Sequence, residues 1–302
     1  MATTRPNPDD ASRLASASSP PGDIDPALGQ WLEHAEPLAW RQSAGLRWVQ
    51  ASRGHIEQSM LLPGVMLDPE GRPGAGAMAV LADSTLGMAA ASSATVHRGA
   101  VTVSLSIDFP ARLDPSRSLK AVGTGRLTDN DTIFATGEMS GEDGRLLCTA
   151  SLHGLIVDSV RDTGWGSRSD GRAAASQSEP AAPSESQVSE SGDGVRLSLT
   201  VPAAWSNGWG NLHGGAVAFL AERSIARMIR RAAGPGRREQ YMHFSIDYLR
   251  PIPADGRPIV SEARIVHAGV SVTHVHAQVR RADGRIAARC RAAARWHFRP
   301  GP

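Results

Sequence analysis

The sequence predicts an α+β protein built from two tandem units, in each of which an antiparallel sheet wraps around one long central helix. Three observations predict this class. Residues 56–110 align with residues 195–249 without a gap, so the chain contains an internal duplication. Each half has a Gly-rich loop followed by an Ala-rich helix of about four to five turns. The segments after each helix alternate between apolar and polar residues and contain Asp-Gly turns, as antiparallel hairpins do.

The duplication is collinear over a whole domain. GAMAVLAD (residues 76–83) falls on GAVAFLAE (residues 215–222), and Ser-Ile-Asp at 106–108 falls on the same tripeptide at 245–247. Chance matches would be scattered and would not keep this order. A repeat period of a whole domain indicates a duplicated domain rather than a solenoid of short repeats.

Two segments have the composition of disordered chain. Residues 1–24 are rich in Pro, Ser, Asp and Thr, and residues 158–194 contain no Leu, Ile or Phe. Such segments cannot bury enough apolar surface to offset the entropy lost on folding. We therefore expect a disordered N-terminus at 1–24, a first domain at 25–157, a flexible linker at 158–194 and a second domain at 195–302.

Charge and cysteine content exclude several classes of function. The net charge is +2, and the 32 basic residues form no long basic block, which argues against a nucleic-acid partner. Cys148 and Cys290 are too few for a disulfide framework or a Cys-rich metal site. His274 and His276 form a His-x-His pair with no evident third ligand, so we expect no metal.

The sequence also favours a cytoplasmic protein with no membrane partner. The most apolar window, residues 74–91, is near the lower limit of spanning length and carries Asp83 within it. We therefore expect a buried helix there rather than a membrane span. The N-terminal residues have no apolar core of the kind that a secretory signal contains.

A loop motif occurs at the start of the second helix. Asn207 precedes His213-Gly214-Gly215 by five intervening residues, and an acid, Glu222, follows eight residues after Gly214. With the order of helix and strands, this motif resembles the hot-dog fold, and more specifically the PaaI-like acyl-CoA thioesterases. The resemblance covers residues 44–157 and 195–298. It implies an acyl-CoA substrate, no cofactor, and further assembly into homo-oligomers as an open possibility.

In that family two hot-dog units pair, and each active site lies at their interface. One unit supplies the loop and the helix N-terminus, and the other supplies the acid on its own helix. The resemblance therefore implies that the two halves of this chain form an intramolecular pseudo-dimer, and the linker would raise their effective concentration.

The chemistry of thioester hydrolysis fits these residue types. The N–H groups at a helix N-terminus can stabilise the negative charge that develops on the carbonyl oxygen, and Gly214 has no side chain to block that approach. The side-chain amide of Asn207 can donate to the same oxygen, and one such donor contributes about 3–4 kcal/mol. A carboxylate within an apolar helix can act as general base or as nucleophile.

The two halves are unequal in these elements. The first half has Asp68, Gly74 and Ala75 where the second has Asn207, His213 and Gly214. A carboxylate at position 68 would repel an oxyanion, so we expect the loop of the first half to be degenerate. The first half, in turn, offers Thr102 where the second offers the bulkier Tyr241.

These differences predict one composite site, with Asn207, His213 and Gly214 from the second half and Asp83 and Thr102 from the first. The other site would combine Glu222 with Asp68 and is expected to be inactive. For His213, a structural role in capping the turn and orienting its neighbours is as well supported by the sequence as a catalytic role. The predicted substrate-binding residues are Trp209, Gly215, Arg230 and Arg231.

Two other functions remain open from the sequence. Loss of the elements in one half is compatible with a non-catalytic acyl-CoA binding or regulatory protein. An enoyl-CoA hydratase is a further alternative on the same fold, although its His–acid motif is not visible in the sequence.

Overall fold

The computed structural model describes nine stretches of the chain, residues 23–24, 28–29, 31–32, 36–68, 70–94, 99–157, 183–191, 194–234 and 237–298. The first half contains β1 (Asp23–Ile24), α3 (Leu38–Ala44), β2 (Leu46–Ser52), β3 (His55–Leu61), η1 (Gly64–Met66), α4 (Ala75–Ser93), β4 (Gly99–Asp108), β5 (Ser118–Leu127), β6 (Thr132–Ser140) and β7 (Leu146–Val157). The second half contains β8 (Ser184–Ser191), β9 (Gly194–Thr200), η2 (Ala203–Trp205), α5 (Gly214–Ala233), β10 (Arg237–Tyr248), β11 (Ile259–Ala268), β12 (Val272–Arg280) and β13 (Ile286–Phe298).

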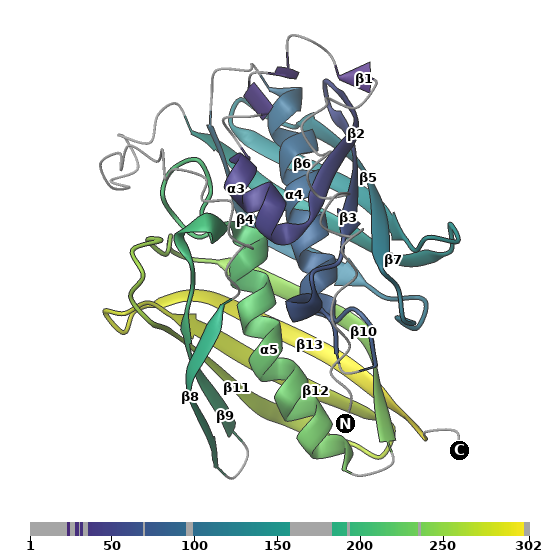
Figure 1. Cartoon of the computed structure of the whole chain (residues 1–302), viewed down its shortest axis with the longest axis vertical. Coiled ribbons are helices and arrows are strands. Elements are labelled where there is room, and N and C mark those ends of the chain that lie inside the picture. Colours follow the sequence, from purple (N-terminus) through teal and green to yellow (C-terminus); the bar gives the residue numbers. More distant parts are fainter. Residues whose placement is uncertain are drawn as a thin grey trace, which may run out of the picture.

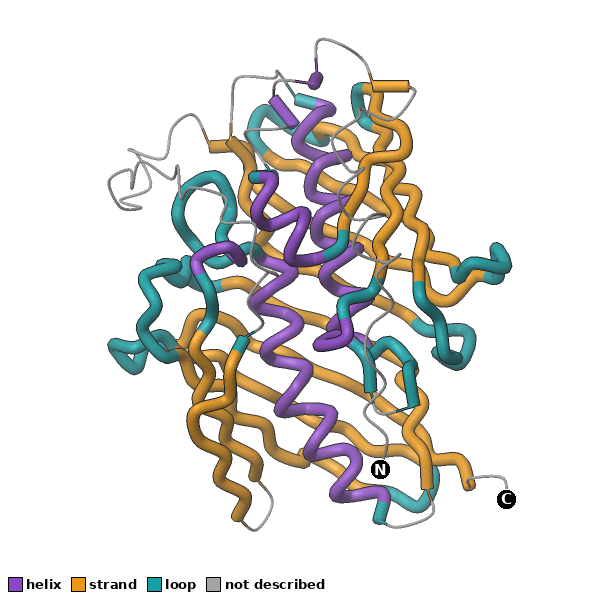
Figure 2. The backbone as a smooth tube through the Cα atoms, in the orientation of Figure 1, coloured by secondary structure: helices purple, strands orange, loops and turns teal. Residues whose placement is uncertain are grey.

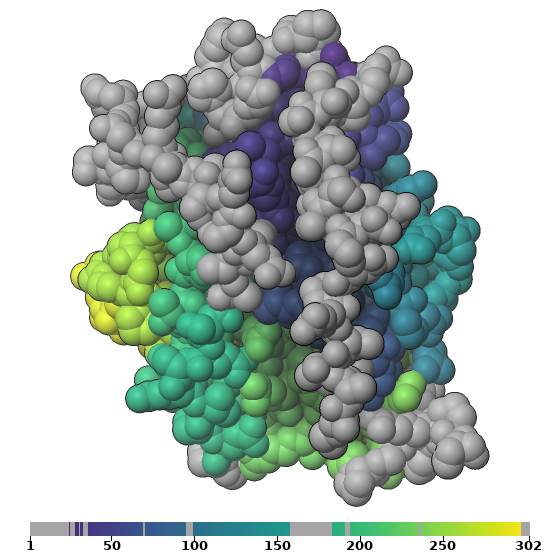
Figure 3. Space-filling view, viewed as in Figure 1, coloured from purple at the N-terminus to yellow at the C-terminus, as the bar shows by residue number. Residues whose placement is uncertain are grey.

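Within the described residues the strands form one 13-stranded sheet in the order β1-β2-β3-β5-β6-β7-β4-β10-β13-β12-β11-β9-β8. The helices α4 and α5 lie on the same side of this sheet, one over each half (Figures 1 and 2). In the space-filling view the purple and blue surface of the first half meets the green surface of the second across the middle of the molecule (Figure 3). The predicted pair of sheet-wrapped helices is thus present, and their sheets are continuous.

The two halves are joined at equivalent strands. β4 pairs with β10 in antiparallel register, and Ser106 lies opposite Ser245. These are the same residue of the repeated Ser-Ile-Asp tripeptide. A contact in which equivalent residues face each other is that of a twofold-symmetric dimer. The tandem halves therefore pair as a pseudo-dimer about an axis near this serine pair.

The same axis brings the two central helices into contact through glycine. A Cβ added to Gly215 would lie 2.8 Å from the Cα of Val80, and one added to Gly76 would lie 3.0 Å from Cδ2 of Phe219. Gly76 and Gly215 are equivalent in the repeat. Because neither carries a side chain, α4 and α5 cross closely enough for residues of one helix to reach the N-terminus of the other.

α4 is the central helix of the first half. Its length and composition would allow it to span a membrane, but 94% of its apolar window is buried within the protein. It packs against β3, β5 and β6 on the sheet side and against α5 at the pseudo-dimer interface. The prediction of a buried core helix around Asp83 is therefore confirmed.

The predicted boundaries of the disordered segments need correction at two places. Residues 1–22 and 158–182 lie outside the described residues. Ser184–Ser191, however, forms β8 and pairs with β9 at the edge of the sheet. Glu185 on β8 also accepts hydrogen bonds from Arg223 and Arg227 of α5. An edge strand held by backbone pairing and ion pairs needs few apolar residues, which is why composition failed to predict it. Asp23–Ile24, which pairs with β2, likewise lies inside the segment predicted as disordered.

The close crossing of α4 and α5 predicts that a side chain at Gly215 lowers the free energy of unfolding. The substitution Gly215→Ala places its Cβ against the backbone of Val80, and such overpacking costs about 1–3 kcal/mol of unfolding free energy. Urea unfolding measures this loss. The matched control is Gly87→Ala, another helical glycine, whose Cβ would meet no atom within 4 Å in the part of the chain that the structure describes. That change is expected to stabilise by about 0.5–1 kcal/mol. Unchanged stability in Gly215→Ala would contradict the close crossing.

Candidate active site

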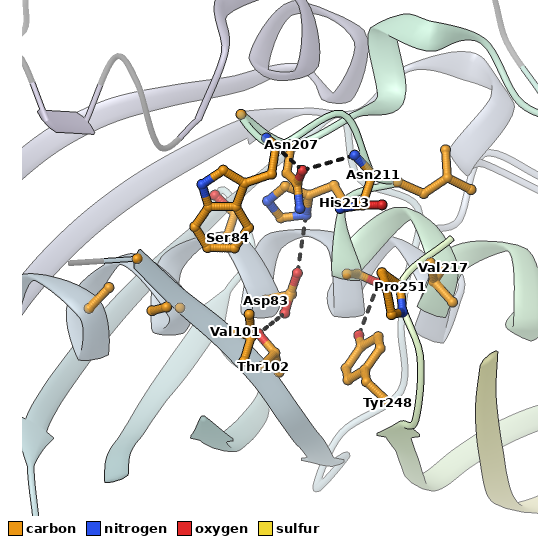
Figure 4. A pocket seen from close by; sticks show the side chains of 18 of the residues that line it. Asp83, Ser84, Val101, Thr102, Asn207, Asn211, His213, Val217, Tyr248 and Pro251 are labelled. Carbon is orange, nitrogen blue, oxygen red and sulfur yellow. Dashed lines mark hydrogen bonds and ion pairs between the residues drawn. The ribbon is translucent and has the colours of Figure 1, made fainter. Parts of the chain in front are cut away.

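A cavity of about 400 Å³ lies where the halves meet, between α4 of the first half and the loop that precedes α5 of the second (Figure 4). Its polar lining comes from both halves and consists of Glu36, Asp83, Ser84, Thr102, Asn207, Asn211, His213, Tyr248 and Arg250. The five residues predicted to form the composite site all line this one cavity, namely Asp83, Thr102, Asn207, His213 and Gly214.

Asp83 is buried on α4 and is held by groups from both halves. The Thr102 hydroxyl on β4 donates to its Oδ1 at 3.0 Å, and the Gly215 N–H at the start of α5 donates to its Oδ2 at 2.6 Å. Nδ1 of His213 lies 3.1 Å from the same Oδ2. The carboxylate therefore lies at the positive end of the α5 dipole, where a negative charge is stabilised.

His213 is the N-cap residue of α5, and its ring lies between two carboxylates. Nδ1 faces Asp83, and Nε2 lies 3.5 Å from Oε1 of Glu36. The ring stacks on Trp40 of α3 with centroids 4.3 Å apart. Every polar edge and one face of the imidazole are thus in contact with protein groups, and the side chain is fixed in orientation.

The two carboxylates determine the charge of His213. Burial alone would lower the pKa of His213, but the hydrogen bonds and negative charges of Asp83 and Glu36 outweigh burial and raise that pKa to about 9. At neutral pH both ring nitrogens therefore carry protons. Nδ1 then donates a hydrogen bond to Asp83. The Gly215 N–H lies 3.2 Å from this nitrogen but donates to the nearer Asp83 oxygen instead.

Glu36 is one of the cavity residues that the sequence analysis missed, together with Ser84, Asn211 and Tyr248. It is 1% exposed and accepts hydrogen bonds from the Ser84 hydroxyl and from Nε2 of Gln58, the latter at 3.3 Å. Glu36 precedes the aligned repeat, so it has no counterpart in the comparison of halves. The available signal was Gln58, a polar residue at an inward-facing position of β3 between Ile56 and Met60.

The loop that carries Asn207 is shaped by its own side chain. Oδ1 of Asn207 accepts the N–H groups of Trp209 and Asn211 at 3.0 and 3.2 Å, which is an Asx turn. Because the oxygen is used in the turn, the amide nitrogen is the end left for the cavity. No hydrogen bond from this nitrogen is found within the described part of the chain.

Asp68 forms the same turn in the first half, which corrects the role predicted for it. Its Oδ1 accepts the N–H groups of Glu70 and Arg72, both at 2.9 Å, and Arg72 also forms an ion pair with Oδ2 at 2.6 Å. The carboxylate is bound within its own loop and neutralised by Arg72. It is therefore not aimed at an oxyanion, and it lies outside the cavity lining.

The start of α5 explains the two adjacent glycines of the motif. A Cβ on Gly214 would lie 2.6 Å from Oδ2 of Asp83, so a side chain there would displace the carboxylate. The N–H of Gly214, in the first turn of α5, has no acceptor within the helix. Gly214 lines the cavity, whereas Gly215 is buried in the helix crossing and its N–H is bound to Asp83. The substrate-binding role predicted for Gly215 is thus replaced by packing and by fixing the acid.

The other predicted substrate-binding residues divide into two groups. Trp209 lines the cavity and packs on Gly99, where a Cβ would lie 2.6 Å from the indole ring. Arg230 and Arg231 lie in the last turn of α5, about 24 Å along the helix from its start. Arg230 is 3.7 Å from Glu239, and Arg231 donates to the carbonyl of Gly194. Neither arginine lines the cavity, and their contact with substrate stays a prediction.

The equivalent site around Glu222 is filled by protein. Glu222 lies against Gly74 at the start of α4, as Asp83 lies against Gly214 at the start of α5. Tyr241 occupies the position that Thr102 has in the first half. Its hydroxyl donates a hydrogen bond of 2.7 Å to Oε1 of Glu222. Burial raises the pKa of Glu222, and this hydrogen bond opposes the rise. Both side chains are buried, and Glu222 does not line the cavity.

The described residues contain no group of three or more His, Cys, Asp and Glu side chains arranged to hold a metal ion. Both cysteines are buried and unpaired with each other. The charged residues of the cavity lining are Glu36 and Asp83, His213 between them, and the exposed Arg250.

Comparisons with known proteins agree with this fold. Residues 210–288 match the family model described as the thioesterase superfamily. Acyl-CoA thioesterase II TesB2 from Mycobacterium marinum is similar at a TM-score of 0.56, with 11% identity over 88% of this chain and 99% of its own. A protein of unknown function with a hot dog fold from Alicyclobacillus acidocaldarius has a TM-score of 0.54, with 16% identity over 87% of this chain and 99% of its own. The 12:0-ACP thioesterase from Umbellularia californica has a TM-score of 0.53, with 10% identity over 81% of this chain and 94% of its own.

At these identities the structural likeness establishes the fold. The tandem hot-dog fold predicted from the sequence is therefore confirmed over nearly the whole chain. The family match falls in the second half, which carries the His-Gly-Gly loop. Neither likeness distinguishes PaaI-like enzymes from other thioesterases, and no curated protein sequence matches the chain.

Protonated His213 makes the stability of the protein depend on pH. Its folded pKa of about 9 lies above its ordinary value of 6.5. The stabilisation is therefore fully present below about pH 6.5 and is lost as the pH rises through about 9. The shift corresponds to on the order of 3 kcal/mol of unfolding free energy, which urea unfolding at a series of pH values measures.

Two variants sharpen this test. His213→Gln should remove the decline between these pH values. Glu36→Gln removes one of the two carboxylates and should move the decline to lower pH. An identical pH dependence in the wild type and in His213→Gln would show that another group is responsible.

Proposed function

We propose that this double hot-dog protein hydrolyses acyl thioesters, with acyl-CoA as the substrate class, at one composite site between its two halves. The observation that carries the proposal is the position of Asp83. A carboxylate from the helix of one half lies in a cavity at the N-terminus of the helix of the other. This is the arrangement that the resemblance to thioesterases implied.

The developing negative charge would be stabilised by groups of the second half. The N–H of Gly214, which has no acceptor within α5, the amide nitrogen of Asn207 and the α5 dipole all favour an anion at this end of the helix. The imidazolium of His213 adds a positive charge at the same place. A thioester carbonyl oxygen bound beside Gly214 would therefore meet preorganised donors.

Asp83 is assigned the role of general base. It removes a proton from a water molecule, whose oxygen attacks the thioester carbonyl carbon and forms a tetrahedral oxyanion. When the intermediate collapses, the C–S bond breaks, and the proton held by Asp83 passes to the thiolate. The products are a free carboxylic acid and CoA. Thr102, bound to Oδ1 of Asp83, fixes the carboxylate in the orientation that this transfer needs.

Hydration of an enoyl thioester is the second candidate, because the cavity contains a His–carboxylate pair, His213 and Asp83. In a hydratase the imidazole exchanges a proton with the substrate. Here Nδ1 faces Asp83, Nε2 faces Glu36 and Trp40 covers one face of the ring. With both nitrogens occupied, the geometry favours hydrolysis, in which His213 serves only as a fixed charge.

Substitution of Asp83 and of Glu222 distinguishes the acid of the composite site from its equivalent in the other half. Asp83→Asn is expected to lower kcat/KM for acyl-CoA hydrolysis by about 10²–10⁴-fold, because it removes the general base. The matched control is Glu222→Gln, the equivalent change in the filled site, which should leave the rate near that of the wild type. Release of free thiol from a panel of acyl-CoAs measures both.

Three outcomes would count against the proposal. Equal losses in both variants would contradict a single composite site. Hydration of enoyl-CoA without thiol release would favour the second candidate. Tight binding of acyl-CoA by a wild-type protein that turns over neither substrate would identify a binding protein.

A second prediction uses the first half as a guide for the loop. Asp68 forms the same Asx turn as Asn207, so Asn207→Asp should preserve the loop while replacing the donor by a carboxylate. The expected loss is about 10²–10³-fold in kcat, the value of one oxyanion donor, with an unchanged melting temperature. A fully active Asn207→Asp enzyme would remove Asn207 from the oxyanion site.

A further inference from the structure

We propose that the acyl group lies in an apolar arm of the cavity that runs along α4 from Asp83 to Ala91, and that Gly87 sets the length of chain admitted. This inference rests on the proposed function, since it assigns the substrate class of the same site. It identifies a specificity-determining residue in the first half, where the sequence suggested none.

The apolar arm is defined by one face of α4 and the sheet beneath it. Along the helix the cavity is lined by Asp83 and then by Gly87, Met88 and Ala91, which lie one and two turns further on. On the sheet side the lining residues are Ile133 of β6 and Leu152 of β7, which are 1% and 0% exposed. A dry wall of this kind accommodates hydrocarbon and excludes a charged carrier group.

The opposite end of the cavity differs in exposure and charge. It is lined by Leu249, which is 46% exposed, and by the exposed Arg250. This end is open to solvent and carries a cation. The polar carrier moiety of a thioester would leave the cavity here, so the acyl group is left with the arm along α4.

Gly87 has no structural reason to be glycine. It lies in the middle of α4, where glycine is less favourable than alanine. A Cβ at this position would meet no atom of the described residues within 4 Å. In contrast, Gly125 packs against α4 so closely that a Cβ would lie 2.3 Å from the backbone of Ala90. The equivalent of Gly87 in α5 is alanine, Ala226, which is buried.

The space left at Gly87 therefore belongs to the cavity. A helix rises 1.5 Å per residue, so Gly87 lies about 6 Å and Ala91 about 12 Å beyond Asp83 along α4. An extended chain advances about 1.2 Å per bond. The arm then accommodates an acyl chain of about ten carbons, and Gly87 lies beside roughly the fifth.

Substitution at Gly87 tests the arm directly. Gly87→Leu fills the space without meeting protein atoms at its Cβ, and Gly87→Ala fills part of it. We expect Gly87→Leu to hydrolyse butanoyl-CoA within about twofold of the wild type and decanoyl-CoA at least about tenfold more slowly, with Gly87→Ala in between. Thermal unfolding of both variants shows whether the fold is kept.

The outcomes separate this inference from the proposed function. If the wild type is active and Gly87→Leu loses butanoyl-CoA and decanoyl-CoA hydrolysis equally, the acyl arm is overturned while hydrolysis stands. The thioethers S-butyl-CoA and S-decyl-CoA, which cannot be hydrolysed, give a second readout by calorimetry. Selective weakening of S-decyl-CoA in Gly87→Leu would support the arm even if the wild type hydrolysed nothing, and equal binding of both thioethers by wild type and variant would overturn it.

Discussion

The hydrogen bond from the Gly215 N–H to Asp83 is the contact on which both the pseudo-dimer and the cavity depend. It joins the start of α5 to the middle of α4 at 2.6 Å. The acid occupies the place at a helix N-terminus where a free anion would bind. Gly214 and Gly215 must both lack side chains, because a Cβ on either would collide with Asp83 or with the backbone of α4. The same contact therefore determines how closely the two helices cross, how the start of α5 is capped and where the acid lies.

The charged groups beside this contact depend on one another. Burying an isolated ion is costly, and the cost is offset only when partners and hydrogen bonds surround it. Here His213 lies between Asp83 and Glu36. The oxygens of the two carboxylates also accept hydrogen bonds from Thr102, Gly215, Ser84 and Gln58. Removal of either carboxylate would leave the imidazolium with one partner. The cluster is thus both a source of stability below the pKa of His213 and the electrostatic environment of the proposed reaction.

Duplication within one chain allows the two sites to diverge, which identical subunits cannot do. The Glu222 side keeps the pseudo-symmetric geometry, since the acid still lies against the start of the other helix. Its Thr102 equivalent, however, is Tyr241, whose ring fills the space and whose hydroxyl binds the acid. In the first half the space persists and extends along α4 past Gly87. One side of the pseudo-dimer has become core and the other has kept a cavity.

The sequence by itself determined the duplication, the tandem hot-dog fold and which residues of the two halves are complementary. These follow from local signals, since periodicity, glycine and the repeat are read along the chain. The structure brings Asp83, Thr102, Asn207, His213 and Gly214 into one cavity, and their catalytic roles stay predictions.

Only the tertiary structure decided the rest. Glu36 and Trp40 reach His213 from a segment before the repeat, β8 forms because an edge strand is completed by its neighbour, and Arg230 and Arg231 lie at the far end of α5. Asp68 binds Arg72 within its own loop. Each of these depends on distances between residues that are remote in sequence or on the direction of a side chain, and neither quantity is encoded in a local pattern.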